Sequence, residues 1–263
     1  MNLLNELPAP SDEVMWTKCR LGHRRHQRIQ LGNRHGLYRS LEIPDNTGIF
    51  TVYDWPQYLN KSELYCTGQD VISQTIQERG IWEPAETRLF IDVLNQGEPG
   101  LVLDVGCQIG WYSTLAAMYR HEVWAVDVNK ENLQLAVSNM MSVATAPFQT
   151  WLGYVNQDAP LLPPDLRIKV VKVDIEGAEQ WAIRMLTAPL SAGQVDYLFM
   201  EVSPVFNDTY PRLFELLDGW GYVPFEISAG PNPAWIRRPI VDVDGFFDDL
   251  WQTDVLFIRK DLT

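Results

Sequence analysis

From residue 101 onward, short apolar runs alternate with segments whose apolar residues recur every three or four positions. The short runs predict strands over residues 101–105, 122–128, 168–175 and 195–202, with a weaker one over 150–155. The periodic segments predict helices over residues 110–119, 129–140, 178–186 and 209–219. Strands that alternate with helices indicate a parallel sheet with helices on both faces.

The two ends of the chain depart from this alternation. Strands are predicted at residues 222–227 and 255–259 with no helix between them, which favours an antiparallel hairpin at the edge of the sheet. Their connection, residues 228–254, is rich in Pro, Gly and Asp and long enough to suggest a functional loop. Upstream we predict a β-hairpin over residues 37–53, a helix over 67–78 and a helix from Pro84 to Gly97.

These elements predict an α/β fold: a Rossmann-like, doubly wound, mostly parallel sheet with an antiparallel C-terminal edge hairpin. Residues 80–263 are expected to form the sheet domain. Residues 1–79 are expected to form an N-terminal extension with a basic arm, a β-hairpin and helices, on the substrate side of the molecule. A chain of 263 residues buries enough surface to need no disulfides.

The net charge of −13 disfavours indiscriminate binding to nucleic acids. The charge is uneven, however, because residues 1–40 carry seven Lys or Arg and three acids. This basic arm has three open interpretations: a solvated segment, a clamp for an anionic substrate, or a segment that docks on the acidic remainder.

The three cysteines show no Cys-x-x-Cys spacing, which favours a reducing, cytoplasmic location. The N-terminal residues contain early acids and no long apolar stretch, so a signal peptide is not expected. No apolar run approaches the ~20 residues that a membrane span requires, so we expect no membrane partner.

The strongest local motif is Leu103-Asp-Val-Gly-Cys-Gln-Ile-Gly110, an apolar strand that passes through a glycine turn into a helix. Ligands of doubly wound sheets bind at such strand ends. Gly106 would let the backbone approach a ligand, and Gly110 would open the helix. The spacing differs from Gly-x-Gly-x-x-Gly, and Asp104 would repel a pyrophosphate. The motif therefore favours a cationic or zwitterionic ligand.

Asp127 lies 23 positions after Asp104, at the end of the next predicted strand. An acid at about this distance from the glycine turn commonly accepts hydrogen bonds from a ribose diol. In this order along the chain, it indicates a cofactor that contains adenosine.

The third motif is Lys172-Val-Asp174-Ile-Glu176-Gly-Ala-Glu179, at the end of the predicted strand 168–175. Glu201 follows at the end of the next strand, facing the same crevice. Asp174 and Glu176 could cap the following helix. Alternatively, the acids orient an acceptor or take its proton. A divalent metal is a further alternative, but no histidine accompanies these acids, and we predict no metal site.

Together, the residues from Asp104 to Thr114 and from Lys172 to Glu179 resemble the FkbM family of methyltransferases, and Gly80-Ile-Trp-Glu-Pro84 resembles the entry to that family's first strand. The resemblance covers about residues 80–260. It implies a class I methyltransferase fold and S-adenosylmethionine as cofactor. This chain has Asp127 where the family more often has Glu-Pro, and it is shorter than expected between residues 139 and 168.

The resemblance assigns the glycine-turn pocket to S-adenosylmethionine. Asp104 and Glu83 would lie near the ammonium group, and the amides around Gly106 and Gly110 near the carboxylate. Asp127 would hold the ribose diol, and Tyr112 would line the methionine arm. The catalytic candidates are Asp174, Glu176 and Glu201 as proton acceptors and Lys172 as the group that polarises the acceptor.

The expected function is methyl transfer to a hydroxyl of a small natural product or sugar. N-methylation of a peptide or amide is an alternative, and so is a nucleic-acid methyltransferase that uses the basic arm. The latter lacks the expected Asn/Asp-Pro-Pro-aromatic motif after residue 175. An NAD-dependent oxidoreductase and a non-catalytic cofactor-binding protein fit the motifs less well. The sequence does not define the oligomeric state.

Overall fold

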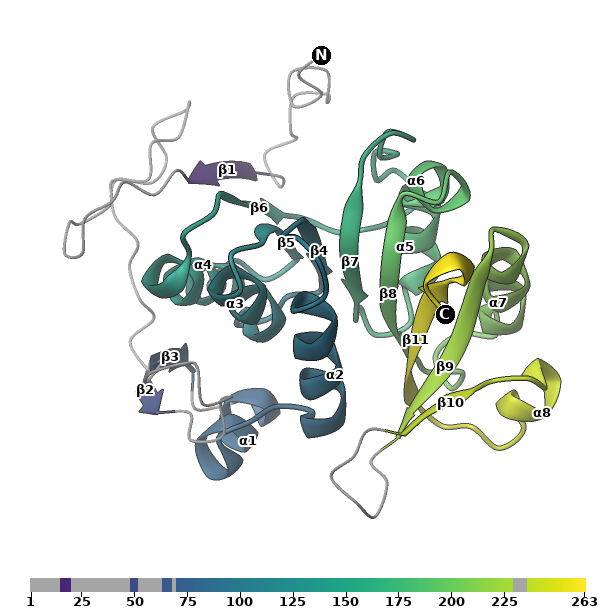
Figure 1. Cartoon of the computed structure of the whole chain (residues 1–263). Helices are drawn as coiled ribbons and strands as arrows, with labels where there is room; N and C mark the ends of the chain where they lie inside the picture. Colours follow the sequence, from purple (N-terminus) through teal and green to yellow (C-terminus); the bar gives the residue numbers. More distant parts are fainter. Residues whose placement is uncertain (1–14, 20–47, 52–62, 68–69, 229–235) are drawn as a thin grey trace.

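A computed structural model describes residues 15–19, 48–51, 63–67, 70–228 and 236–263 (Figure 1). Its main sheet has nine strands in the order β1-β6-β5-β4-β7-β8-β11-β9-β10. The parallel centre consists of β4 (Leu101–Val105), β5 (Glu122–Asp127), β6 (Phe148–Leu152), β7 (Ile168–Val173) and β8 (Val195–Val202). The predicted Rossmann-like, doubly wound α/β fold is confirmed.

The C-terminal strands pair as predicted, antiparallel and at one side of the sheet. Strand β11 (Thr253–Arg259) is antiparallel to β9 (Tyr222–Ser228) and also to β8, so it lies between them. The pair therefore joins the parallel strands through β11, the last strand in the sequence. The described part of the edge beyond β9 is formed by β10 (Ile236–Pro239).

The prediction of no helix between these strands is wrong, because helix α8 (Val243–Phe247) precedes β11. Asp242 caps this helix by accepting a hydrogen bond from the Gly245 amide at 3.1 Å. Phe246 and Phe247 pack on Phe214, which explains why a Pro- and Asp-rich connection forms a helix here.

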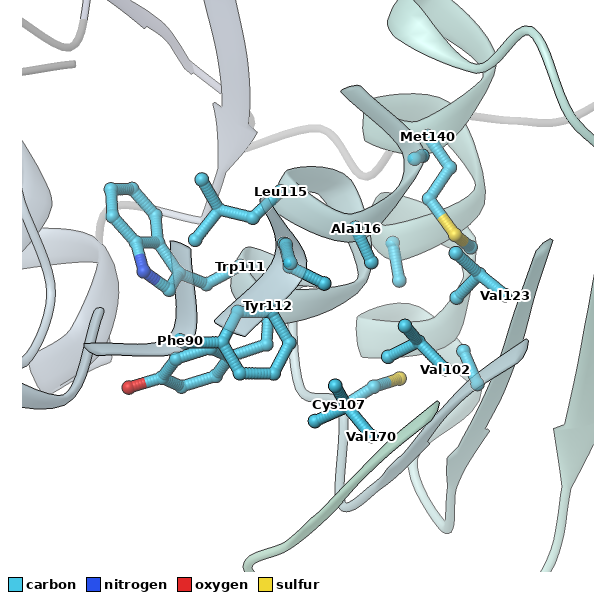
Figure 2. Close-up of a cluster of buried hydrophobic side chains, with 14 of the residues drawn as sticks. Phe90, Val102, Cys107, Trp111, Tyr112, Leu115, Ala116, Val123, Met140 and Val170 are labelled. Carbon is cyan, nitrogen blue, oxygen red and sulfur yellow. The ribbon is translucent and has the colours of Figure 1, made fainter. Parts of the chain in front are cut away.

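Helices cover both faces of the sheet (Figure 1). One buried cluster joins the sheet to α1 (Val71–Arg79), α2 (Pro84–Leu94), α3 (Trp111–Met118) and α4 (Lys130–Val143). Figure 2 shows part of this cluster, where the rings of Phe90 and Tyr112 pack edge to face with centroids 4.9 Å apart. A second cluster joins the other face to α5 (Glu179–Met185), α6 (Thr187–Ser191) and α7 (Tyr210–Gly219).

Several element ends differ from the prediction. Strand β6 begins at Phe148 and ends at Leu152, two or three residues earlier than the predicted 150–155. Helix α2 ends at Leu94 instead of continuing to Gly97. Helix α1 begins at Val71, four residues later than predicted, and ends at Arg79, followed by Gly80 as a left-handed C-cap with a φ of 73°.

The described parts of residues 1–79 pack on the sheet domain. Strand β1 (Met15–Cys19) is antiparallel to β6, and β2 (Gly48–Thr51) pairs with β3 (Glu63–Cys66). Leu64, Cys66 and Ile76 belong to the same buried cluster as α2 and α3. The first strand of the hairpin predicted over residues 37–53 lies outside the described residues. So does most of the basic arm, and the boundary at residues 79 and 80 stays a prediction.

None of the helices in the described ranges is both long enough and apolar enough to span a lipid bilayer.

Candidate active site

The strand order reverses between β4 and β7, because the chain runs outward through β5 and β6 before it returns to β7 on the other side of β4. Ligands of doubly wound sheets bind beyond the carboxyl ends of the strands at this point. All the predicted site residues lie at or next to these strand ends, except Glu83 and Tyr112, which are contributed by α2 and α3.

The turn after β4 is built on two glycines with positive φ. Gly106 has a φ of 86°, and a Cβ atom added there would lie 1.8 Å from the carbonyl oxygen of Asp174. Gly110 has a φ of 80°, and its added Cβ would lie 2.7 Å from the Cβ of Ala136. Gly110 is the N-cap of α3, as predicted. Glycine is therefore needed at position 106 because the end of β7 passes close to the turn. The sequence had suggested only that a ligand approaches there.

Asp127 joins the end of β5 to the glycine turn. Its Oδ2 accepts a hydrogen bond from the backbone N–H of Gln108 at 2.8 Å, and its Oδ1 accepts one from the backbone N–H of Asn129 at 2.7 Å. The pKa of Asp127 is raised by burial, which these amide donors partly offset. The Asn132 side chain and the Val128 backbone also lower the pKa of Asp127 by hydrogen bonding, to a smaller extent.

Asp104 lies beneath the turn and is only 1% exposed. Its Oδ2 accepts a hydrogen bond from the Ser113 hydroxyl at 2.5 Å, which connects β4 to α3. Burial raises the pKa of Asp104 to about 6. Asp104 therefore contacts protein groups in this structure, and its predicted contact with a cofactor stays a prediction.

Lys172 forms the centre of a buried ion cluster on the face of the sheet that α2 and α3 cover. Its side chain is 1% exposed. Its Nζ atom lies 3.2 Å from Glu86 Oε1, 3.4 Å from Asp174 Oδ2 and 3.8 Å from Asp254 Oδ1. The same Nζ lies 5.2 Å from the centroid of the Tyr112 ring, within the range of a cation–π contact.

Charge in this cluster is unbalanced, since one ammonium faces several carboxylates. Burial and the nearby Asp254 raise the pKa of Glu86 well above its ordinary value. Burial also raises the pKa of Asp254 to about 6. For Lys172, burial acts to lower the pKa, but Glu86, Asp174 and Asp254 outweigh it and hold the pKa well above its ordinary value. Lys172 therefore stays charged and holds the carboxylates in place.

Glu83 and Tyr112 lie next to this cluster. The Tyr112 hydroxyl donates to Glu83 Oε2 at 2.7 Å. Glu83 precedes α2 with a left-handed φ of 39°, a conformation that is unfavourable for a residue with a side chain. The structure thus brings Glu83 and Tyr112 together, and the predicted contact of each with a cofactor stays a prediction.

The turn from Asp174 to Glu179 is held by Glu179, which is fully buried. Glu179 Oε1 accepts hydrogen bonds from the amides of Ile175 and Gly177 at 3.2 and 3.1 Å. Its Oε2 accepts one from the Tyr210 hydroxyl at 2.5 Å. Helix α5 has no side-chain cap at its N-cap residue, so helix capping does not explain Asp174.

Glu176 is exposed at the top of this turn and has a left-handed φ of 55°. The pKa of Glu176 is raised, first by partial burial and then by repulsion from Asp174 and Glu179. Strained residues of this kind persist only where their surroundings hold them, and they are frequent at functional sites.

Glu201 lies at the end of β8, directly opposite Asp254 of β11. Its side chain is held by Gln252, whose Nε2 donates to Glu201 Oε1. Its Oε2 is buried without a hydrogen-bond partner. Burial, followed by repulsion from Asp174 and Glu176, raises the pKa of Glu201 to about 8.

Sequence reasoning missed Glu86, Asp254, Gln252 and the role of Glu179. The burial of Glu86 could have been predicted from the sequence. Glu86 precedes Leu89, Phe90 and Val93 by three, four and seven positions, so it lies on the same face of α2 as these apolar residues. An acid at such a position must be paired once it is buried. Glu179 carried no comparable signal, because its bonds to the turn depend on the local backbone path.

Among the described residues, one acidic group has the spacing of metal ligands: Glu83, Glu86 and Asp254. Lys172 supplies a positive charge to two of its three members. His121 lies away from the carboxyl ends of the strands. Its buried ring accepts a hydrogen bond from the Gly100 amide at 3.0 Å, at the opposite edge of the sheet.

A pocket of about 410 Å³ lies at the other end of the strands, where the parallel strands begin. Its lining includes Gln96, Arg167, Lys169, Asp196 and Tyr197, which precede or begin the parallel strands. None of the predicted site residues contributes to it.

No family model matches the chain, and no curated protein matches it either. Solved structures do. A TehB-like SAM-dependent methyltransferase from Corynebacterium glutamicum is 13% identical, with 71% of this chain and 94% of that chain covered and a TM-score of 0.44. A putative transferase from Pyrococcus horikoshii is 14% identical, with 82% and 73% covered and a TM-score of 0.44.

A third match is the magnesium protoporphyrin IX methyltransferase from Synechocystis with bound SAM. It is 13% identical, with 72% of this chain and 84% of that chain covered and a TM-score of 0.43. Similarity at this level does not define a family or a function. The functional argument therefore rests on the geometry of the site, and the FkbM resemblance stays a prediction.

Proposed function

We propose that the chain is an S-adenosylmethionine-dependent methyltransferase of the FkbM type that acts on a hydroxyl of a small natural product or sugar. The observation that carries this proposal is the hydrogen bond of 2.8 Å from the backbone N–H of Gln108 to the Asp127 carboxylate. This bond joins the glycine turn of β4 to the acid of β5 at the edge where ligands of this fold bind.

The residues present suit this cofactor. Asp127 is a carboxylate at the end of β5 that could accept hydrogen bonds from a ribose diol, and the turn between Gly106 and Gly110 offers backbone close to the strand ends. Glu83, Asp104 and the cluster around Lys172 make the surroundings acidic. Acidic surroundings favour a cofactor with a sulfonium and an ammonium group over a dinucleotide with its pyrophosphate. When bound, the cofactor would supply an electrophilic methyl group.

The protein's own contribution would be to align the acceptor and to receive its proton. Asp174, Glu176 and Glu201 lie at the ends of β7 and β8, next to the glycine turn across the switch point. Of these three, Glu176 and Glu201 have a raised pKa, which suits a group that accepts a proton near neutral pH. Lys172 is buried among carboxylates, so in this proposal it positions Asp174 instead of touching the acceptor.

Replacing Asp127 by alanine should weaken the binding of S-adenosylhomocysteine by about 1.5–3 kcal/mol, because one charge-assisted pair of hydrogen bonds is lost. This corresponds to roughly a ten- to hundred-fold higher Kd by titration calorimetry. Asp165→Ala is the matched control. It removes an exposed acid just before β7, at the end of the strands away from the proposed site. Asp127 also holds two backbone amides, so each variant's melting temperature is measured. A folded Asp127→Ala variant with unchanged affinity would contradict the assignment.

A further inference from the structure

Glu201 has a hydrogen-bonding capacity that the protein itself leaves unused. The residue is 6% exposed, and one of its carboxyl oxygens is fixed by Gln252 while the other is buried without a partner. Leaving a buried acceptor unpaired is costly, so such atoms usually have a ligand or another partner in the functional state.

The groups around Glu201 are mostly acidic. Asp174 and Glu176 face it from the end of β7, and Asp254 lies opposite it on β11. Within the described part of the chain, Lys172 forms ion pairs with Glu86, Asp174 and Asp254 but not with Glu201. A second cation bound near Glu201 would therefore gain attraction from several carboxylates.

The spacing of these acids favours an organic cation over a metal ion. The described group with metal-ligand spacing contains Glu83, Glu86 and Asp254 and does not include Glu201. Divalent metals need several oxygens that converge at short distances. An ammonium group needs only one or two carboxylate oxygens within hydrogen-bonding distance.

Exposed aromatic side chains lie in the loops that follow β8 and precede β11. Phe206, 60% exposed, follows β8 and lies against the turn of β7, since a Cβ added at Gly177 would be 2.7 Å from its own Cβ. Trp251, 69% exposed, directly precedes Gln252. Such rings offer apolar contact and a cation–π contribution to an amine with an apolar body.

We propose that the ends of β7 and β8 and the start of β11 form an acceptor subsite in which Glu201 binds a protonated amine of the acceptor. This inference rests on the proposed function and narrows its substrate class. An ammonium group has no lone pair and is not a nucleophile, so it serves for recognition. The methylated atom is then a hydroxyl elsewhere on the same molecule, and Asp174 and Glu176 remain the candidates for taking its proton. Acceptors that carry a carboxylate or phosphate in this position are excluded by the surrounding acids.

The proposal predicts a release of protons that is independent of turnover. Because burial and repulsion from Asp174 and Glu176 raise the pKa of Glu201, its carboxyl holds a proton at pH 7 more often than an ordinary glutamate does. A bound ammonium stabilises the ionised form and lowers that pKa, so Glu201 gives up its proton. Amine binding at pH 7 should therefore release protons, at most one per amine bound.

The test uses three phenols with the same two-carbon side chain: tyramine, which ends in an ammonium, tyrosol, which ends in a hydroxyl, and 4-hydroxyphenylacetate, which ends in a carboxylate. Each is titrated calorimetrically into the full chain at pH 7, with and without S-adenosylhomocysteine, in two buffers of different ionisation enthalpy. We expect tyramine to bind at least about ten-fold more tightly than the carboxylate, with proton release. Glu201→Gln should weaken the preference and abolish the proton release.

Glu215→Gln is the matched control, because it removes one exposed glutamate on α7 and should preserve both effects. Equal binding of the three phenols, a preference for the carboxylate, no binding of any of them to the folded protein, or an unchanged preference in Glu201→Gln would each overturn the proposal. Binding of S-adenosylhomocysteine is measured in the same experiments. Cofactor binding without amine selectivity refutes only the subsite, whereas amine selectivity without cofactor binding refutes the proposed function.

Discussion

Replacing Lys172 by methionine is expected to lower the free energy of unfolding by about 3–5 kcal/mol, because it leaves buried carboxylates without their cation. Glu86 and Lys172 are each 1% exposed, and their charged atoms lie 3.2 Å apart. Methionine has a similar length, so the effect comes mainly from charge and not from an empty cavity. Chemical denaturation at pH 7 measures it directly.

The cost of this substitution should depend on pH in a defined direction. Carboxyl groups whose pKa is raised in the folded state bind more protons there than in the unfolded chain. They therefore contribute stability at low pH that is lost as pH rises through the folded pKa. In the variant, Glu86 and Asp254 lose their cation, and their pKa values should rise further. The variant should consequently be more destabilised at pH 8 than at pH 5.

A surface pair provides the control. Lys260 and Asp218 are 3.0 Å apart but 55% and 67% exposed, so Lys260→Met should cost no more than about 1 kcal/mol. Adding Glu86→Leu to Lys172→Met should recover part of the lost stability, because it removes one of the unpaired carboxylates. If Lys172→Met were as mild as Lys260→Met, the buried cluster would not be an ion cluster of the kind described.

Replacing Gly106 by alanine is expected to cost at least about 4 kcal/mol or to prevent folding. The added Cβ would lie 1.8 Å from the carbonyl oxygen and 2.8 Å from the carbonyl carbon of Asp174. Backbone atoms cannot move away without breaking the bond from the Asp174 amide to the Val105 carbonyl, which is 2.9 Å long. The substitution would thus separate β4 from β7 at the proposed cofactor site.

Gly97→Ala separates the two causes of this effect. Gly97 also has a positive φ, at 61°, but nothing lies within 4 Å of its added Cβ. It should therefore show only the cost of a left-handed alanine, about 1–2 kcal/mol. Denaturation curves of both variants give the comparison, and an equal loss in the two would show that the contact with Asp174 does not matter.

The central part of the fold could be predicted from the sequence because period-two and period-3.6 patterns are local properties. Strands β4, β5, β7 and β8 and helices α2, α3, α4 and α7 were each predicted near their observed positions. The position of β11 between β8 and β9 was not predictable in this way. It depends on which edge is open once the parallel strands have formed, and a hairpin pattern does not specify that edge.

The site was predicted in part for the same reason. Residues at strand ends, such as Asp127 and Asp174, could be located by counting along the pattern. Asp254 could not be placed beside Lys172, because that contact follows from the insertion of β11 next to β8. Gln252 was missed because its only distinguishing feature is its hydrogen bond to Glu201, a residue 51 positions away in the sequence.

Hydrogen–deuterium exchange with and without S-adenosylhomocysteine tests the central claim most directly, because it locates the cofactor without requiring a known acceptor. The account predicts that the ligand slows exchange in peptides covering residues 104–112 and 125–132, which contain the glycine turn and Asp127. Peptides covering residues 94–101 and 167–169, which line the pocket at the opposite edge, should be unchanged. Protection confined to those latter peptides, or no protection in a folded protein at a saturating ligand concentration, would contradict the account.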